Sequence, residues 1–148
     1  MSTPYDTPAA PSPTYFHRPP RVLIADDHPL FAQALRHALT DWQFEVLEQA
    51  RNGAEAVEIA ARERPDVVLM DIYMPVLDGI AATRQVRALS PDTRVVAITS
   101  DDAPAISAAA RDAGASVVLV KSCAPDELLD AVHWAVGEAV PFRLSGAA

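Results

Sequence analysis

Five short runs of mostly apolar residues recur along the chain from residue 21 onward. They cover residues 22–25, 44–47, 67–70, 95–98 and 117–120. Four of the five contain several β-branched residues, and none of the five alternates regularly between apolar and polar positions. A strand that is covered on both faces has this pattern, because neither of its faces meets water. The runs therefore predict five buried strands of a parallel sheet.

The stretches between these runs have helical spacing. Pro29 suits a first helical turn, and apolar residues then follow it at the spacing of one helix face. Residues 53–64, 80–89, 103–113 and 126–136 form four further helical stretches, and Gly114 is a typical helix end. Strand and helix thus alternate five times. This order predicts an α/β fold, with right-handed crossovers and helices on both faces of the sheet.

The composition narrows the possible functions. Hydrophobic residues make up 50% of the 148, which is enough for a sizeable core. The net charge is −8 and the 12 basic residues are scattered, so we expect no direct nucleic-acid binding by this chain. No apolar run approaches the ~20 residues of a membrane helix, and no signal peptide is recognised. With a single cysteine, Cys123, the chain has no intrachain disulfide, and we predict a cytoplasmic domain.

Residues 1–20 differ from the rest of the chain. They are rich in proline, with Ser, Thr and Ala between the prolines. Proline lacks the backbone N–H that helices and sheets need, and the segment has little apolar content with which to pack. We therefore predict a disordered extension over residues 1–20, one domain over residues 21–140 and a short tail over residues 141–148.

Polar side chains follow the ends of four predicted strands. Asp26 and Asp27 follow the first strand, Asp71 the third, Thr99 the fourth and Lys121 the fifth. Taken singly, each is more often a cap, turn, strand or surface residue. Together they lie where such sheets bind ligands, at the carboxyl ends of the strands. Three carboxylates that meet need a cation, and Mg²⁺ (or Mn²⁺) prefers oxygen ligands. One carboxylate can then attack phosphorus, while the ammonium and the hydroxyl hold phosphoryl oxygens.

Other interpretations of these residues are weaker. His28 follows the two aspartates, but it begins a helix and has no second histidine nearby, so we interpret it as a helix-start residue rather than a ligand. A phosphohydrolase with an aspartate nucleophile carries a second acid two residues later, where this chain has Tyr73. A nucleotide-binding module has a glycine-rich loop after the first strand, and none is present here.

Residues 21–31 resemble the opening of response-regulator receiver domains, especially of the nitrate-response and nitrogen-fixation branch. Residues 67–79 resemble the phosphorylation strand and loop of that family, and residues 95–102, residues 113–115 and Lys121 complete the likeness. The likeness extends over about residues 21–140. It implies a doubly wound, flavodoxin-like (βα)5 sheet with strand order 2-1-3-4-5.

The resemblance also implies roles for single residues. Asp71 would accept the phosphoryl group in a Mg²⁺-dependent reaction, Thr99 would be the switch hydroxyl, and Lys121 would pair with the phosphate. Tyr73 and Asp101 would influence the access of hydrolytic water. The implied metal ligands are Asp26 (through water), Asp27, Asp71 and the backbone carbonyl of Tyr73.

The function implied by the resemblance is a phosphoacceptor switch rather than an enzyme. A sensor histidine kinase or phosphotransfer protein would supply the phosphoryl group, and a downstream partner would respond. A phosphorylation-dependent homodimer is a further expectation. By the same resemblance, Pro75 and Gly79 would shape the loop after Asp71. The chain departs from the family at Val118, where many members have Tyr or Phe, and at Ser122, where many have Pro.

The context of the domain has two interpretations. The branch that the chain resembles usually continues into a helix-turn-helix output domain, for which residues 141–148 are too few. Treating 148 residues as the whole chain, we expect a stand-alone receiver. The alternative is the receiver half of a DNA-binding transcriptional regulator whose output domain is absent from this chain.

Overall fold

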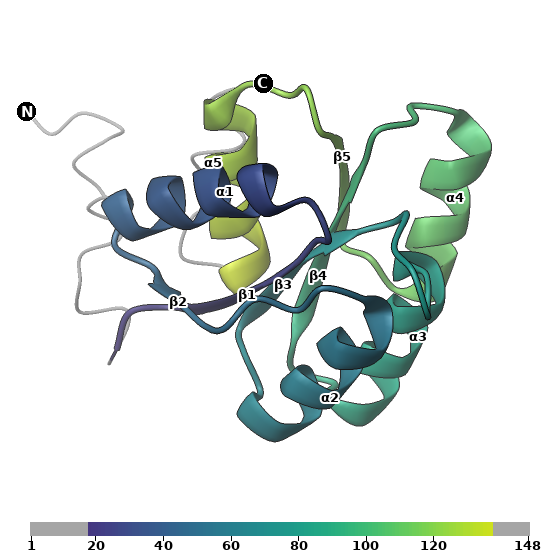
Figure 1. Cartoon of the computed structure of the whole chain (residues 1–148), viewed down its shortest axis with the longest axis horizontal. Helices are drawn as coiled ribbons and strands as arrows, with labels where there is room; N and C mark the ends of the chain where they lie inside the picture. The colour runs from purple at the N-terminus through teal and green to yellow at the C-terminus, as the bar shows by residue number, and fades with distance from the viewer. Residues whose placement is uncertain (1–17, 138–148) are drawn as a thin grey trace, which may run out of the picture.

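The computed structural model describes residues 18–137, in which strands and helices alternate along the chain. The strands are β1 (Arg21–Ala25), β2 (Glu45–Val46), β3 (Val67–Asp71), β4 (Arg94–Thr99) and β5 (Val117–Val120). The helices are α1 (Pro29–Asp41), α2 (Gly53–Glu63), α3 (Gly79–Leu89), α4 (Pro104–Ala113) and α5 (Pro125–Val136). All strand pairs are parallel, in the order β2-β1-β3-β4-β5 (Figure 1). The predicted α/β class and the strand order are therefore confirmed.

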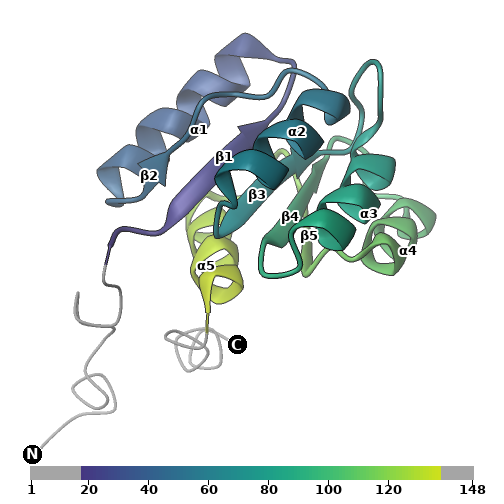
Figure 2. The same ribbon diagram turned by 90° about the horizontal axis from the view of Figure 1, so that it is seen from below.

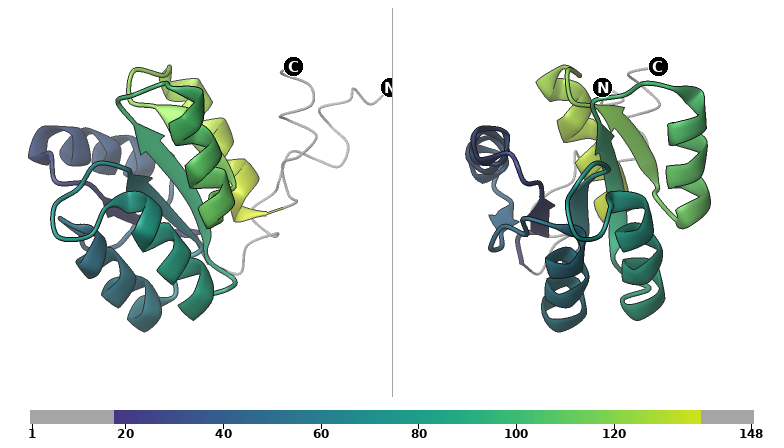
Figure 3. Two further views of the ribbon diagram at one scale, coloured as in Figure 1. Left: turned by 90° about the vertical axis from the view of Figure 1, so that its right-hand side faces the viewer. Right: turned by 45° about the vertical axis from the view of Figure 1, so that its right-hand side comes forward.

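Two apolar cores lie on the two faces of the sheet. Successive residues of β3 alternate between them: Val67 and Leu69 face one core, and Val68 and Met70 face the other. Helices α1 and α5 cover the first core, whereas α2, α3 and α4 cover the second (Figures 1 and 3). The central strands are buried on both faces, which is the physical reason for their nearly continuous apolar sequence.

The edge strands depart from the predicted pattern. Figure 2 shows β2 as a short strand beside β1. The prediction placed a strand at residues 44–47, but the regular ladder of β2 contains only Glu45 and Val46. Phe44 instead lies in the core beneath α1 and α5, with its ring 5.2 Å from that of His133. Strand β5 is half-buried along its whole length rather than covered on both faces. An edge strand has only one neighbour, so packing defines it less strongly than a central strand.

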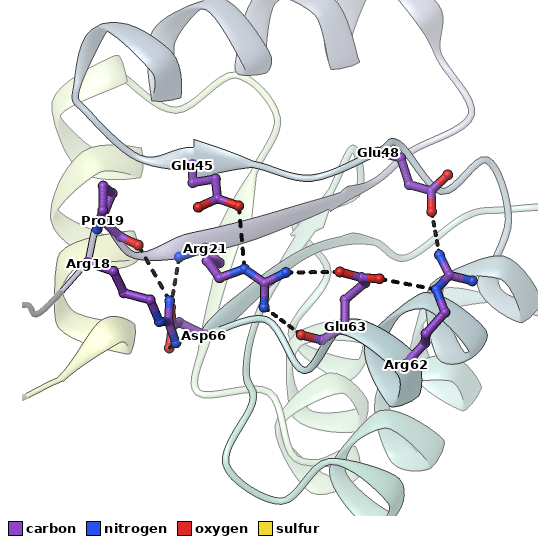
Figure 4. A network of polar contacts seen from close by, with 8 residues as sticks. All are labelled: Arg18, Pro19, Arg21, Glu45, Glu48, Arg62, Glu63 and Asp66. Carbon is purple, nitrogen blue, oxygen red and sulfur yellow. Dashed lines mark hydrogen bonds and ion pairs between the residues drawn. The ribbon is translucent and has the colours of Figure 1, made fainter.

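A polar network joins the amino ends of the strands (Figure 4). The carboxylate of Asp66 accepts a hydrogen bond from the backbone N of Arg21 at 2.7 Å and pairs with Arg18 Nη1 at 2.9 Å. The Arg21 guanidinium donates to the carbonyl of Glu63 at 2.6 Å and lies 3.5 Å from the carboxylate of Glu45. Among the described residues, Arg18, which lies before the predicted domain boundary at residue 21, thus contacts the domain.

The terminal segments lie largely outside the described residues. The predicted extension over residues 1–20 is described only from residue 18, and the tail over residues 141–148 is not described, so both stay predictions. Within residues 18–137, none of the helices combines the length and hydropathy needed to cross a bilayer.

Candidate functional site

The fold brings the polar strand ends together at one edge of the sheet. Asp26 follows β1, and its backbone N donates to Ala50 O at 2.9 Å. Asp71 ends β3 and is in register with Ile98 of β4, so Thr99 lies one residue further along that strand. The backbone N of Lys121 donates to the carbonyl of Thr99 at 2.8 Å, which places the lysine after β5 at the same edge. Parallel strand order and register therefore assemble the site.

The ammonium of Lys121 bridges two buried carboxylates. Its Nζ lies 3.1 Å from Asp26 Oδ2 and 3.3 Å from Asp71 Oδ2. Each of these aspartates is only 2% exposed, so little water solvates their charges. The same Nζ lies 4.7 Å from the centre of the Phe31 ring, a favourable position for a cation. Lys121 therefore supplies one positive charge for two carboxylates that are largely removed from solvent.

The surroundings of Asp71 raise the pKa of its carboxyl group. Burial raises the pKa of Asp71, and the nearby carboxylate of Asp26 raises it further. The ammonium of Lys121 and the backbone N of Tyr73, which donates to Asp71 Oδ1 at 3.3 Å, act in the opposite direction without cancelling the rise. A second cation at this edge would stabilise the ionised carboxylate, because opposite charge favours the charged form.

The donor set fits a hard divalent cation. Asp26, Asp27, His28 and Asp71 each offer one ligand atom, and these atoms all lie within 4.8 Å of one another. Three of the four donors are carboxylates, which Mg²⁺ accepts while it keeps several waters. The side chain of Asp27 is 35% exposed, so the group is open to solvent. The role of the Tyr73 carbonyl as a further ligand stays a prediction.

His28 belongs to this group, although its position in the sequence indicated only a helix-start residue. It is indeed the N-cap of α1, but its side chain makes no capping hydrogen bond. Its Nδ1 lies 3.1 Å from Asp26 Oδ1, 3.4 Å from Asp27 Oδ1 and 3.0 Å from Lys121 Nζ. The signal in the sequence was its position directly after two strand-end aspartates, since a helix that starts there faces the same edge.

Thr99 is fully buried, and its hydroxyl is engaged within its own loop. Thr99 Oγ1 accepts a hydrogen bond from the backbone N of Asp101 at 2.9 Å and donates to the carbonyl of Asp101 at 3.1 Å. Among the described residues, the hydroxyl thus contacts Asp101 rather than Asp71. Val118, at the position where many receivers carry an aromatic ring, is partly buried against the core beneath α2, α3 and α4.

The loop after Asp71 is tight. The backbone N of Leu77 donates to the carbonyl of Pro75 at 2.7 Å, and Val76 between them has a φ of 70°. This is a γ-turn with positive φ, a strained conformation for a β-branched residue. A Cβ atom on Gly79 would lie 2.1 Å from the carbonyl oxygen of Asp71, so only glycine fits where α3 begins. The predicted role of Pro75 and Gly79 in shaping this loop agrees with these contacts.

The site geometry and the fold define a class of protein. Residues 22–133 match the response regulator receiver domain family, and the chain belongs to this family. It is therefore a receiver domain of the kind found in two-component response regulators.

Several known proteins are similar to this chain. Response regulator MprA from Mycobacterium sp. (strain KMS) is 38% identical over 111 residues, which are 75% of this chain and 48% of the relative. The transcriptional regulatory protein YxjL of Bacillus subtilis (strain 168) is 35% identical over 130 residues, 86% of this chain and 59% of the relative. The chain thus spans about half the length of these relatives.

Solved structures of response-regulator proteins are similar to this chain as well. The receiver domain of NarL from Mycobacterium tuberculosis superposes with a TM-score of 0.77 at 36% identity, and the match covers 80% of this chain and 97% of that one. CheY in the CheX-CheY-BeF3-Mg²⁺ complex from Borrelia burgdorferi gives a TM-score of 0.77 at 26% identity, covering 82% and 92%. That complex contains both a divalent cation and beryllium fluoride.

Proposed function

We propose that this domain is a phosphoacceptor switch in which Asp71 takes a phosphoryl group from a sensor histidine kinase or a phosphotransfer protein. The observation that supports this most directly is the ammonium of Lys121 held between the buried carboxylates of Asp26 and Asp71. A nucleophilic oxygen, a cation and an open group of carboxylates are the parts that phosphoryl transfer requires.

The chemistry follows from these residues. An oxygen of Asp71 forms the new P–O bond while the P–N bond of the donor phosphohistidine breaks, and the donor imidazole leaves with the electron pair. Lys121 Nζ, already 3.3 Å from Asp71 Oδ2, then pairs with a phosphoryl oxygen. The residues that would hold Mg²⁺ (or Mn²⁺) are Asp26, Asp27, Asp71 and the carbonyl of Tyr73. When bound, the metal offsets the negative charge shared by the carboxylates and the phosphoryl oxygens.

The phosphorylated state differs from the resting state through Thr99. An aspartyl phosphate brings roughly two negative charges and strong acceptor oxygens to the site. The Thr99 hydroxyl moves from Asp101 to one of these oxygens, and the loop of residues 100–104 follows. The change reaches the face formed by α4, β5 and α5, where a second copy or another partner would respond. Phosphorylation can shift this equilibrium only by its different contacts with the two states.

The wider context is proposed on the same basis. We infer that the chain acts in the cytoplasm as a switch rather than as an enzyme, and that it does not itself bind nucleic acid or membranes. The transcriptional role in the name of YxjL belongs to that protein. The choice between a stand-alone receiver and the receiver half of a longer DNA-binding regulator stays a prediction.

Intact-mass spectrometry tests the proposed function. The protein is incubated with acetyl phosphate and Mg²⁺, and its mass should rise by one phosphoryl group. Asp71→Ala should take up none, whereas Asp102→Ala, which removes an exposed carboxylate of the β4–α4 loop, should be labelled like the wild type. Absence of added mass, or equal labelling of Asp71→Ala, would contradict the proposal.

A further inference from the structure

A hydrogen bond joins two loops above the phosphorylation site. Tyr73 Oη, in the loop between β3 and α3, donates to Asp101 Oδ2, in the loop between β4 and α4, at 3.2 Å. The two residues are 28 positions apart, and Tyr73 is 46% exposed. Both residues lie outside the two apolar cores. This bond, which we call the latch, therefore connects two surface loops rather than supporting the core.

The latch is continuous with the hydrogen bonds of Thr99. The second carboxylate oxygen of Asp101, Oδ1, accepts from the backbone N of Ala103 at 2.9 Å, directly before α4. The backbone N and carbonyl of Asp101 occupy the Thr99 hydroxyl as described above. A threonine hydroxyl has a single hydrogen to donate. While it donates to Asp101, it has none to offer to a phosphoryl oxygen on Asp71.

Asp101 therefore bonds both to the Thr99 hydroxyl and to Tyr73, so a change at one contact acts on the residue that makes the other. If Thr99 turns toward Asp71, the backbone of Asp101 loses both of its bonds to the hydroxyl and shifts. Its carboxylate is then carried away from Tyr73. We propose that the Tyr73–Asp101 hydrogen bond holds the resting conformation, so that breaking it favours the conformation competent for phosphate. This inference rests on the proposed function, and it gives Tyr73 and Asp101 positioning roles that act through Thr99.

The latch also provides a route from Thr99 to the surface that needs no aromatic ring on β5. Val118 occupies the position where many receivers carry that ring, and it packs into the core. In this chain, the hydroxyl of Thr99 is instead connected through Asp101 to the exposed ring of Tyr73. Through its hydrogen bond to Asp101, the Tyr73 side chain therefore restrains the position of the β4–α4 loop.

The expected change in the ratio of the two conformations follows from the free energy of one hydrogen bond. A hydrogen bond of this kind contributes a modest net free energy, which corresponds to about a 3- to 10-fold change in the ratio of the two conformations. Where the competent conformation is the minor one, the affinity for a phosphate mimic rises by the same factor. Tyr73→Phe removes the hydroxyl and keeps the ring, so the shielding of the site from water changes little.

The test measures binding of beryllium fluoride to the whole chain in the presence of Mg²⁺, by titration calorimetry. Tyr73→Phe and Asp101→Ala should each bind about 3- to 10-fold more tightly than the wild type. The double variant should match Asp101→Ala alone, because the hydroxyl has already lost its acceptor. Asp102→Ala, the matched control on the same loop, should bind like the wild type. Melting curves confirm that each variant is folded.

The outcomes distinguish a failure of the latch from a failure of the proposed function. If the wild type binds beryllium fluoride and Tyr73→Phe binds with the same affinity, the latch is refuted and the proposed function stands. Fully additive effects in the double variant would also refute the latch, since independent residues add. If the wild type binds no beryllium fluoride and is not labelled by acetyl phosphate, the proposed function fails, and the latch fails with it.

Discussion

Substitution of Gly79 tests whether the start of α3 determines the position of Asp71, the proposed phosphoacceptor. A Cβ atom at this position would lie 2.1 Å from the carbonyl oxygen of Asp71 and 2.7 Å from the Cα of Ile72. Both neighbours are backbone atoms at the end of β3, and Asp71 and Ile72 are almost completely buried. Gly79→Ala must therefore move either the first turn of α3 or the end of β3.

The expected cost can be worked out from these contacts. Forcing an extra carbon into a packed site typically costs about 1 to 3 kcal/mol. Replacing a helical glycine by alanine returns about 0.5 to 1 kcal/mol through the entropy of the unfolded chain. We expect Gly79→Ala to lower the free energy of unfolding by about 1 to 2 kcal/mol, which is a melting temperature lower by roughly 3 to 10 °C. Labelling by acetyl phosphate should slow as well, because Asp71 is displaced.

Two other glycines provide controls. A Cβ atom at Gly137 would meet nothing within 4 Å, so Gly137→Ala should melt and react like the wild type. A Cβ atom at Gly53 would lie 2.0 Å from Leu77 O, and its three nearest atoms all belong to Leu77 rather than to Asp71, so Gly53→Ala should lower the melting temperature with a smaller effect on labelling. Thermal unfolding by circular dichroism and intact-mass kinetics measure both properties. Wild-type stability and wild-type labelling of Gly79→Ala would refute the reasoning.

Four further predictions concern the site. Burial and a neighbouring carboxylate raise the pKa of Asp71, so its ionised form destabilises the metal-free fold. Asp71→Asn should therefore melt at a higher temperature than the wild type at pH 7 in EDTA. This advantage should vanish as the pH falls below the ordinary carboxyl pKa of about 4, and an advantage that does not change with pH would contradict the assignment. Lys121→Met leaves two buried carboxylates without their cation and should lower the free energy of unfolding of the metal-free protein in urea by about 2 to 4 kcal/mol. The cost is smaller than for a fully buried pair because the side chain of Lys121 is 18% exposed. An unchanged urea midpoint would argue against the ion-pair bridge. Tyr73→Ala and Asp101→Ala should change the decay rate of the phosphorylated protein more than the melting temperature, and unchanged decay would contradict their proposed role in water access. Val76→Gly relieves a positive φ at an exposed position and should stabilise by about 0.5 to 1 kcal/mol in thermal unfolding, so a loss of stability would show that no strain is stored there.

Much of the site could be predicted from the sequence because it depends on topology. A parallel sheet places the carboxyl ends of its strands at one edge, whatever side chains follow them. Asp71 and Lys121 are therefore brought together across 50 residues by the alternation of strands and helices alone. The apolar runs predicted the central strands well for a related reason: a strand buried on both faces has no polar positions to obscure it.

The sequence predicted the edges and the loops less well. The 44–47 run is apolar partly because Phe44 packs beneath helices, so hydrophobicity alone overestimated the length of β2. His28 looked like an ordinary helix-start residue because two of its partners, Asp71 and Lys121, are far away in the sequence. The need for glycine at position 79 depends on how closely α3 approaches β3, which no local pattern reports.

The sequence by itself determined the order of the elements, the buried faces of the central strands and the identity of the groups at the strand ends, because periodicity and chain order set these locally. Only the tertiary structure decided that Lys121 bridges two carboxylates, that Thr99 is bonded to Asp101, and that Tyr73 reaches across to the same loop. Hydrogen bonds and ion pairs act over about 3 Å, so they depend on side-chain rotamers and loop paths that become defined only when the packed strands and helices fix their relative positions.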